Sequence, residues 1–293
     1  MMAIFGQTII SAVAAGAIYA LIAVGFSLIY QTTKLVNFAH GSIAILAPYV
    51  SYSLLKLGLV MPAAVLGGVL AAAAFAFVMD RVVLAPLRTR HISVPILATV
   101  AVAIVIEAVI SLVWGSQPLY LESLASDEPW RISGLSITPN QVVIVGITGA
   151  VVLPLLWVIA TTKVGRAMRG CAQDPEVVTL FGVSPARMYL LSFVLGGVLA
   201  GLAGVLIAPV TGLKPTGGLE LSTIGFSAAV LGGLGSLPGA LVGGFLIALL
   251  VNMTQVYLSA GYGLGVAYLV MALVLLVRVR GLFGDDIEAV RQV

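Results

Sequence analysis

The chain has 293 residues, of which 61% are apolar and only 9% carry a formal charge. An ordinary soluble domain has roughly 25% charged residues, so 14 basic and 11 acidic side chains are too few to coat a soluble protein of this length. With a mean hydropathy of +1.18, this composition predicts a multi-spanning membrane protein and excludes soluble enzymes and nucleic-acid-binding proteins. The single cysteine, Cys171, excludes an internal disulfide and a cysteine-based metal cluster.

Stretches without Lys, Arg, Asp or Glu locate the predicted spans, because a helix that crosses a bilayer needs about 20 mostly apolar residues. The last such stretch, residues 221–277, has 57 residues, which we expect to make three crossings of which at least one is short or broken. The predicted fold class is all-α: a polytopic membrane helix bundle of about eight to nine passes with discontinuous helices, forming a single domain over residues 1–293. The earlier predicted segments are 9–30, 35–55, 57–79, 92–113 (interrupted by Glu107), 132–162 and 188–213.

Basic residues predict the orientation, because they favour the cytoplasmic side of a membrane protein. Eleven of the 14 basic residues fall on one predicted face, and the opposite face has a loop at 114–139 that carries three acidic residues. We therefore expect an external N-terminus, a cytoplasmic C-terminus and a cytoplasmic loop at 161–187. The basic residues of the cytoplasmic face are Lys34, Arg81, Arg88, Arg90, Lys163, Arg166, Arg169, Arg187, Arg278, Arg280 and Arg291; the acidic residues of the external loop are Glu122, Asp127 and Glu128.

Two segments are predicted to interrupt membrane helices. Residues 31–48 contain a polar break followed by a short apolar run with Pro48, and residues 231–244 contain six glycines and a proline. Paired interruptions in the two halves of a chain indicate a transport pathway, although Gly-rich segments and small-xxx-small patterns also allow tight helix packing. The candidate pathway residues are Asn37, His40, Gly41 and Ser42 in the first segment and Gly232, Gly233, Gly235 and Ser236 in the second.

Glu107 is the one carboxylate that we expect deep inside a span. A charge at that depth costs roughly 2.5–3.5 kcal/mol on insertion scales, so it is a candidate pathway residue. It could meet a ligand's ammonium group, or it could bond neighbouring helices together. His40 and Ser42 could suggest a nucleophile and its base, but no oxyanion hole is recognisable. We therefore expect His40 and Asn37 to bond backbone groups, and we predict no catalytic residue and no metal site.

The loop at 161–187 contains the signals of a short helix. Asp174 is a typical N-cap before Pro175, Glu176 is favourable in the first turn, and Gly182 is a typical stop. The side chains of Val177, Leu180 and Phe181 would then share one face of a helix of only two turns, which is too short to be stable alone. Such an exposed apolar face predicts a protein partner; the alternative is that the helix lies against its own membrane domain.

Three segments resemble one family. The sequence GAIYALIAVGFSLIYQTTKLVNFAHGS (16–42) resembles the N-terminal signature of the permeases of branched-chain amino acid ABC importers, of the LivH type. RAMRGCAQDPEVVTLFGV (166–183) is similar to that family's coupling segment, and LGGLGSLPGALVGG (231–244) to its Gly-rich signature. Two departures from the family pattern are Ser42, at a position that is often acidic, and Pro48, in place of a usual glycine.

This resemblance implies a heteromeric importer in the bacterial plasma (inner) membrane. Its parts would be two related permeases, two cytoplasmic ATPases and an external solute-binding protein that delivers branched-chain amino acids or similar small solutes. ATP and Mg²⁺ would bind the ATPases, because none of the four lysines of this chain is followed by Ser or Thr as in a P-loop. The alternative is a stand-alone secondary transporter. The residues expected to couple the permease to the ATPase are Arg169, Ala172, Asp174, Glu176, Val177, Leu180, Phe181 and Gly182.

Overall fold

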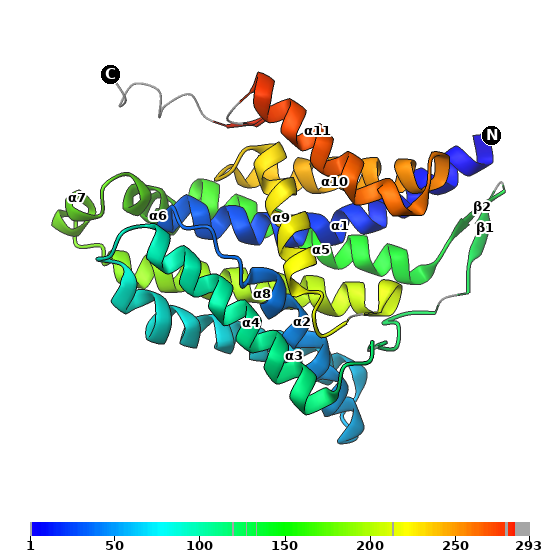
Figure 1. Ribbon diagram of the computed structural model, residues 1–293, viewed down its shortest axis with the longest axis horizontal. Coiled ribbons are helices and arrows are strands. Elements are labelled where there is room, and N and C mark those ends of the chain that lie inside the picture. Colours follow the sequence, from blue (N-terminus) through cyan, green and yellow to red (C-terminus); the bar gives the residue numbers. More distant parts are fainter. Residues whose placement is uncertain are drawn as a thin grey trace.

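The computed structural model describes residues 2–118, 120–126, 128–132, 134–212, 214–278 and 281–284, and these are almost entirely helical (Figure 1). A two-stranded antiparallel hairpin and a few single-turn helices complete the described part. The helices are α1 (Met2–Thr33), α2 (His40–Lys56), α3 (Met61–Val78), α4 (Ser93–Trp114), α5 (Pro139–Thr161), α6 (Lys163–Gln173), α7 (Pro175–Leu180), α8 (Pro185–Thr211), α9 (Gly218–Gly232), α10 (Leu237–Tyr257) and α11 (Gly263–Val277).

Seven helical segments are long and apolar enough to cross a bilayer, which confirms the predicted polytopic helical fold. They comprise α1, α4, α5, α8, α10, α3 with its continuation to Leu87, and α11 with the turn that precedes it. The window at 221–277 does form three helices, α9, α10 and α11, of which α9 has only 15 residues. The other short helix, α2, has 17 residues and follows the first predicted interruption. With α2 and α9 counted, the number of segments agrees with eight to nine passes.

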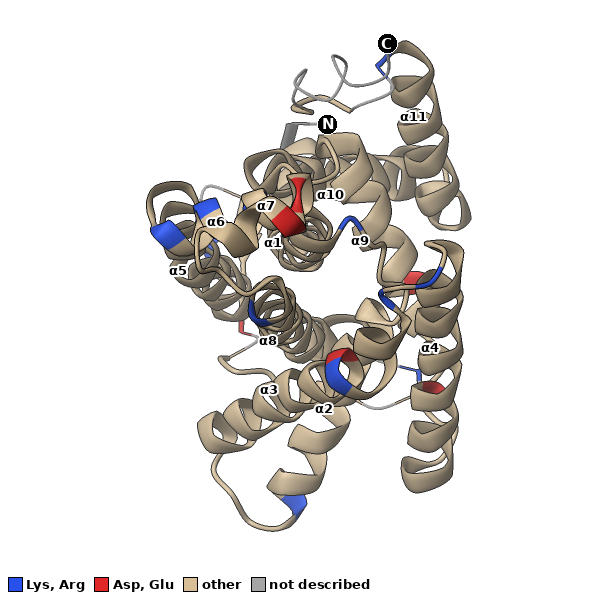
Figure 2. Cartoon of the chain, turned by 90° about the vertical axis from the view of Figure 1, so that its left-hand side faces the viewer, with Lys and Arg blue, Asp and Glu red and all other residues tan. Residues whose placement is uncertain are grey.

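The short helices α2 and α9 run across the direction of the long ones (Figure 1). Figure 1 shows α9 and α2 running obliquely to the long axis of α1. The apolar windows of α1 and α8 are 67% buried and that of α10 is 50% buried, whereas those of α4 and α5 are only 22% buried. The end view in Figure 2 accordingly places α1 and α8 near the centre and α4, α5 and α11 at the periphery. The outer helices therefore present apolar side chains to lipid or to another subunit.

Small residues bring the central helices close together. A β-carbon on Gly197 would lie 2.6 Å from the Ala76 side chain, and one on Gly201 would lie 2.9 Å from that of Ala72, so α8 packs directly on α3. Gly239 and Gly243 of α10 face the backbone of α9 in the same way. These small-xxx-small faces therefore pack helices against one another.

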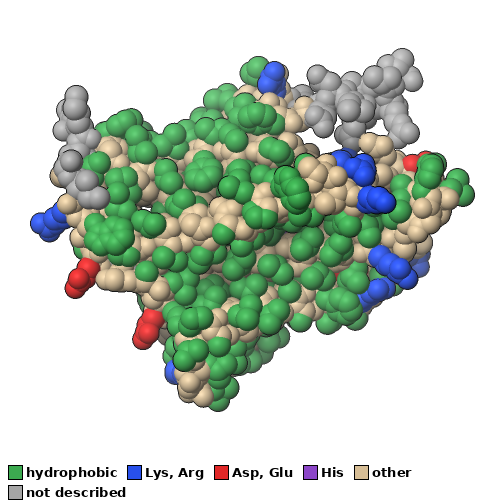
Figure 3. Space-filling model, turned by 180° about the vertical axis from the view of Figure 1, so that it is seen from behind, with side chains coloured by type: hydrophobic (Ala, Val, Ile, Leu, Met, Phe, Trp, Pro, Cys, Tyr) green, Lys and Arg blue, Asp and Glu red, His purple; other side chains and the backbone are tan. Residues whose placement is uncertain are grey.

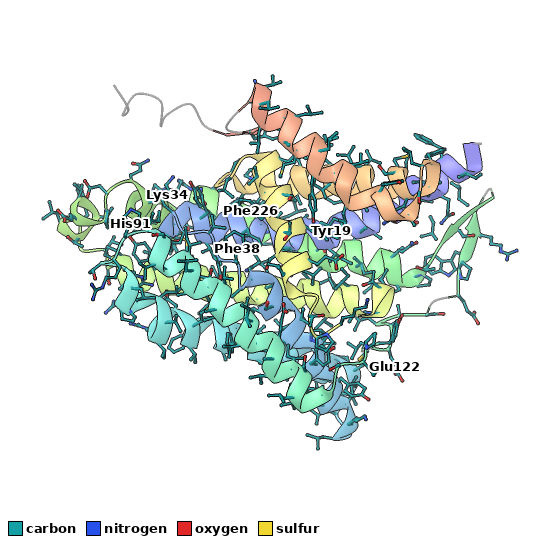
Figure 4. The ribbon with its side chains drawn as sticks, viewed as in Figure 1. Tyr19, Lys34, Phe38, His91, Glu122 and Phe226 are labelled. Carbon is teal, nitrogen blue, oxygen red and sulfur yellow. The ribbon has the colours of Figure 1, made fainter. Side chains whose placement is uncertain are left out.

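Charged side chains gather at the two ends of the molecule. Figure 4 places Lys34 and His91 at the end that carries α6 and α7, and Glu122 at the opposite end. Arg88 lies 4.8 Å over the ring of Tyr189 at the start of α8, so the loop after α3 reaches the same end as α6 and α7. From behind, a broad apolar band separates these ends (Figure 3). Asp127, Arg280 and Arg291 lie outside the described residues.

Three local features were not expected from the sequence. The loop at 114–139 contains a hairpin, β1 (Trp130–Ile132) and β2 (Leu135–Ile137), in which Trp130 pairs with Ile137. The loop at 161–187 contains α6 in addition to the predicted short helix. The third helix continues as a π-helical segment, Met79–Leu84, which buries Asp80 against the Arg88 guanidinium. Glu107 is therefore not alone: Asp80 is a second carboxylate inside a candidate span, Met61–Leu87.

Candidate translocation site and coupling surface

The connection at 34–39 forms a tight turn that starts α2. The Asn37 carbonyl accepts the His40 N–H at 3.2 Å, and the Asn37 side-chain oxygen accepts the Ala39 N–H at 3.1 Å. An Asn side chain that bonds the backbone two residues on is a common way to stabilise a turn. Lys34, just before it, is the one non-glycine residue of the described chain with a positive φ, at 57°. The Asn37 side chain therefore bonds a backbone group, as predicted.

Ser222 of α9 ties this turn to the opposite half of the chain. Its hydroxyl donates to the Phe38 carbonyl at 2.7 Å and accepts the Gly41 N–H at 2.8 Å. The Phe38 N–H in turn donates to the Thr99 hydroxyl of α4 at 3.1 Å. Free backbone groups at the interrupted helix are thus satisfied by side chains from two other helices, as the membrane interior requires.

Glu107 joins the same cluster from α4. Its Oε1 atom accepts hydrogen bonds from the Ser42 hydroxyl and from the Leu219 N–H, both at 3.2 Å. Leu219 lies in the first turn of α9, where a helix has N–H groups without internal partners. No hydrogen bond among the described residues reaches the other oxygen, Oε2. Glu107 therefore links α4 to the starts of α2 and α9 and keeps one oxygen for a further partner.

Glycines let α2 and α9 touch through their backbones at this point. A β-carbon on Gly41 would collide with the Gly218 carbonyl and the Ser222 N–H, and one on Gly218 would collide with the Ser42 hydroxyl. Both glycines and Ser42 are buried. The structure thus brings together four predicted residues from the first interruption with Glu107, and adds Thr99, Gly218 and Ser222, which sequence reasoning missed.

A row of aromatic rings that begins at His40 lies beside this cluster. The His40 ring is fully buried and lies 4.8 Å from the Phe26 ring, and neither ring nitrogen has a hydrogen bond of normal geometry. The Phe226 ring of α9 lies 6.3 Å from Phe26 and 6.0 Å from Phe38, and Figure 4 shows Phe38 and Phe226 beside α9 in the middle of the bundle. The expectation that the His40 side chain bonds backbone groups is therefore wrong: the ring packs as an aromatic group against Phe26 and Gly25 of α1.

The second interruption lies at the other end of α9. Gly232 is the last residue of α9 and Gly233 its C-cap. Gly232 lies 14 residues after Gly218, which corresponds to about 21 Å of helical rise. Gly233 and Gly235 have positive φ values of 112° and 92°, and the Ser236 side chain caps α10 by accepting the Gly239 N–H. The N–H groups of residues 282 and 283 donate to the Leu231 and Gly232 carbonyls. The four predicted pathway residues of this segment thus form a tight turn apart from the Glu107 cluster.

We expect Ser222→Ala to destabilise the protein measurably. The variant leaves the buried Phe38 carbonyl and Gly41 N–H without partners, at about 1–3 kcal/mol for each unsatisfied group, so the midpoint of thermal unfolding in detergent should fall by several degrees. Ser27→Ala is the control, in the neighbouring helix α1, because the buried Ser27 hydroxyl has no hydrogen-bond partner to lose. Equal midpoints for the two variants would contradict the proposed role of Ser222.

The second candidate site is the surface formed by α6 and α7. As predicted, Asp174 caps α7: its Oδ1 atom accepts the N–H groups of Glu176 at 3.0 Å and Val177 at 3.1 Å. The helix ends at Leu180, and Gly182 follows with a positive φ of 76°. The predicted helix from Pro175 onward is therefore confirmed. The next helix, α8, begins at Pro185, and Ser184 before it forms no side-chain cap.

The apolar side chains of α7 project away from the protein. Leu180 is 85% exposed, Phe181 80% and Val177 46%. Figure 1 shows α7 at the tip of the molecule, beyond the ends of the long helices. The alternative that α7 lies against its own membrane domain is therefore wrong for these three side chains. Of the other predicted coupling residues, Glu176 is exposed and Arg169 and Ala172 are half-buried in α6.

Short-range contacts fix α6 to the membrane helices. Gly165 packs against the Ile159 carbonyl at the end of α5, a position that a β-carbon would occupy. The Arg169 guanidinium donates to the same carbonyl at 2.8 Å, and the Tyr189 hydroxyl of α8 donates to the Cys171 carbonyl at 3.4 Å. Burial raises the pKa of the Cys171 thiol, which disfavours the reactive thiolate. These contacts would therefore transmit a displacement of α6 and α7 to both α5 and α8.

Interrupted helices that meet at polar groups in the middle of a membrane bundle, together with an exposed apolar helix at one end, are the features of a membrane transport subunit. Residues 8–279 match the family described as branched-chain amino acid transport system / permease component, and the chain belongs to this family. Among the described residues, no group of three or more His, Cys, Asp or Glu side chains could hold a metal ion.

Curated relatives share nearly the whole chain. It is 33% identical to the high-affinity branched-chain amino acid transport system permease protein LivH of Salmonella typhimurium, over 98% of both chains. It is 30% identical to the corresponding permease protein BraD of Pseudomonas aeruginosa, over 97% of both chains. Among solved structures, PsaBC from Streptococcus pneumoniae in complex with Fab is similar with a TM-score of 0.50 and 12% identity, over 92% of this chain and 90% of that one. That likeness concerns the fold alone.

Proposed function

We propose that this chain is the membrane-spanning subunit of an ATP-driven importer of branched-chain amino acids in the bacterial inner membrane. The observation that carries the ATP-driven part is α7, whose capped helix presents Val177, Leu180 and Phe181 outside the protein. A surface of this kind needs a partner, and a pair of cytoplasmic ATPases supplies both the partner and the energy. Relatives named for branched-chain amino acid transport support the substrate class.

The proposed orientation follows from the same surface. The end that carries α6 and α7 also carries Lys34 and the basic loop after α3, so it faces the cytoplasm by the positive-inside rule. The hairpin β1–β2 and Glu122 then face the exterior, where a solute-binding protein delivers the ligand. A second related permease completes the pathway. This chain binds neither ATP nor Mg²⁺ in the proposal; both belong to the ATPases.

The Glu107 cluster is the proposed part of the pathway that meets the ligand. An amino acid carries an ammonium group, and the free Oε2 atom of Glu107 offers it a charge-assisted hydrogen bond. The two bonds to Oε1 hold the carboxylate in place from α2 and α9. When the ATPases move α7, the contacts of α6 with α5 and α8 transmit the displacement into the bundle, and the starts of α2 and α9 shift against one another.

Reconstitution tests this function directly. The chain, co-expressed with its neighbouring permease and ATPases, should copurify with the ATPases and support leucine uptake into proteoliposomes that stops without ATP. The external binding protein should be required for uptake and should bind leucine, isoleucine or valine in calorimetry. Uptake by the chain alone, driven by an ion gradient, would instead establish a secondary transporter.

We expect Glu107→Gln to lower uptake at limiting leucine by tenfold or more. Gln keeps an oxygen that can accept from Ser42 and Leu219, so the helices stay joined, but it loses the charge that pairs with the ammonium group. A hydrogen bond to a charged group contributes about 1.5–3 kcal/mol, and 1.4 kcal/mol is a factor of ten. Initial rates of uptake measure the effect, and the thermal midpoint serves as the control for folding. Unchanged uptake would show that Glu107 only joins helices.

A further inference from the structure

An apolar groove opens between α5 and α8 on the rear of the molecule. It has a volume of about 450 Å³ and is lined at one end by Val164 of α6. Aliphatic side chains of α5 and α8 form its two walls, and α6 contributes Val164 only. The lining residues are Val151, Pro154, Leu155, Val158 and Ile159 of α5, Val164, and Leu191, Leu195, Val198 and Leu199 of α8.

Pro154 lies in the wall of the groove, inside α5. It has no N–H to donate to the carbonyl four residues earlier, so α5 lacks one internal hydrogen bond beside the groove. The outer side of α5 is otherwise exposed: Trp157 is 66% exposed and Leu153 60%. Tryptophan favours the boundary between hydrocarbon and headgroups. Trp157 therefore indicates that the end of the groove at Val158, Ile159 and Val164 lies near that boundary.

Basic side chains surround the end of the groove. Lys163, Arg166 and Arg169 lie at i, i+3 and i+6 in α6, and none of them forms an ion pair with a carboxylate in the described chain. The Arg166 and Arg169 side chains each give one N–H to a carbonyl at the end of α5, Thr161 at 3.1 Å and Ile159 at 2.8 Å. A guanidinium has five N–H donors, so most remain for a ligand. Figure 3 shows Lys and Arg gathered at this end of the apolar band.

We propose that this groove binds one anionic phospholipid, with an acyl chain between α5 and α8 and the headgroup on Lys163 and Arg166. Two features on one site select this ligand: an aliphatic channel within the bilayer and unpaired cations where the channel meets the headgroup level. Basic pockets between membrane helices on the cytoplasmic side favour anionic headgroups. A zwitterionic lipid would fill the channel equally well but would gain less from the cations. The proposal holds whatever solute the protein carries.

The lipid would also hold α6 in place. It would lie against α5, α6 and α8 together, the three helices that connect the exposed surface of α7 to the bundle. Bound lipid would thus stabilise the arrangement that transmits movement from α7, in addition to the direct contacts of Gly165 and Arg169.

Photolabelling tests the proposal in membranes that contain the full-length chain with its partner subunits. Phosphatidylglycerol with a photoactivatable acyl chain should label peptides 151–159 and 191–199 at least fivefold more than the matching phosphatidylcholine. Lys163→Gln combined with Arg166→Gln should reduce phosphatidylglycerol labelling to the phosphatidylcholine level and leave phosphatidylcholine labelling unchanged, which also shows that the groove is intact. The control is Arg131→Gln combined with Lys214→Gln, which removes the same amount of charge at the opposite end of the molecule. It should change neither phosphatidylglycerol labelling nor phosphatidylcholine labelling.

Three results would overturn the proposal. Equal labelling by the two lipids would show that the basic residues do not select an anionic headgroup. A preference for phosphatidylglycerol that persists in the double variant would show that the headgroup binds away from Lys163 and Arg166. Absence of labelling in the assembled transporter, with crosslinks from α5 to a second subunit, would show that a protein covers the groove.

Discussion

Replacing Val177, Leu180 and Phe181 together by Asp is expected to abolish ATP-dependent uptake while the chain still folds. These side chains contact little of their own protein, so their loss leaves the core intact. Burying an aliphatic or aromatic side chain in an interface contributes about 1.5–3 kcal/mol, and the variant replaces three such contributions with desolvated charges. ATPase binding to the permease should therefore weaken by at least a hundredfold, measured by copurification and by titration of the purified subunits.

Thr179→Asp is the matched control for this variant. Thr179 is exposed on the same helix but does not share the apolar face, so its replacement by Asp adds a charge to α7 and leaves that face intact. It should retain most of the ATPase binding, whereas Leu180→Asp alone should lose much of it. If the triple variant recruits ATPases and transports leucine as the parent does, α7 is not the docking element. Unchanged thermal midpoints in all variants would show that the comparison concerns docking and not folding.

The success of the sequence prediction at α7 has a local cause. An N-cap residue, Pro at the first helical position and a terminal Gly act within a few residues of one another, so Asp174, Pro175 and Gly182 can be interpreted without knowledge of the fold. The membrane spans were predictable for a related reason, since bilayer thickness fixes their length. The exposure of Leu180 and Phe181 follows less directly, because it depends on where the long helices end.

The sequence predicted only the part of the Glu107 cluster that lies at Asn37–Ser42 and at Glu107 itself. Ser222, which bonds Phe38 and Gly41, is 184 and 181 residues away from them in the chain. Nothing near Phe38 in the sequence indicates that its carbonyl accepts from Ser222. A weak signal existed, since Gly218-x-x-x-Ser222 is a small-xxx-small pattern at the start of α9. Asp80 escaped prediction for a different reason. Asp80 and Arg81 end the charge-free stretch at residue 79, but the helix continues past them in π-helical form, and Asp80 pairs with Arg88.

Gly41→Ala is expected to have the largest effect of any single substitution in the Glu107 cluster. The added β-carbon would collide with the Gly218 carbonyl and the Ser222 N–H, both of which belong to a backbone that cannot rotate away. Overpacking a core costs typically 1–3 kcal/mol, and here it also separates the groups that hold Phe38 and Ser42. We expect uptake to fall below a tenth of the parent rate and the thermal midpoint to drop by several degrees.

Gly146→Ala separates this steric effect from the general effect of adding a methyl group to a membrane helix. Gly146 lies inside α5, and no atom lies within 4 Å of the position that its β-carbon would take. Alanine there should be neutral or slightly stabilising, because glycine is the poorer helix former by roughly 0.8–1.0 kcal/mol. Parent-like uptake by the Gly41 variant would mean that α2 and α9 separate at no cost. The contact between their first turns would then not be needed for transport, and the ligand would have to pass elsewhere in the bundle.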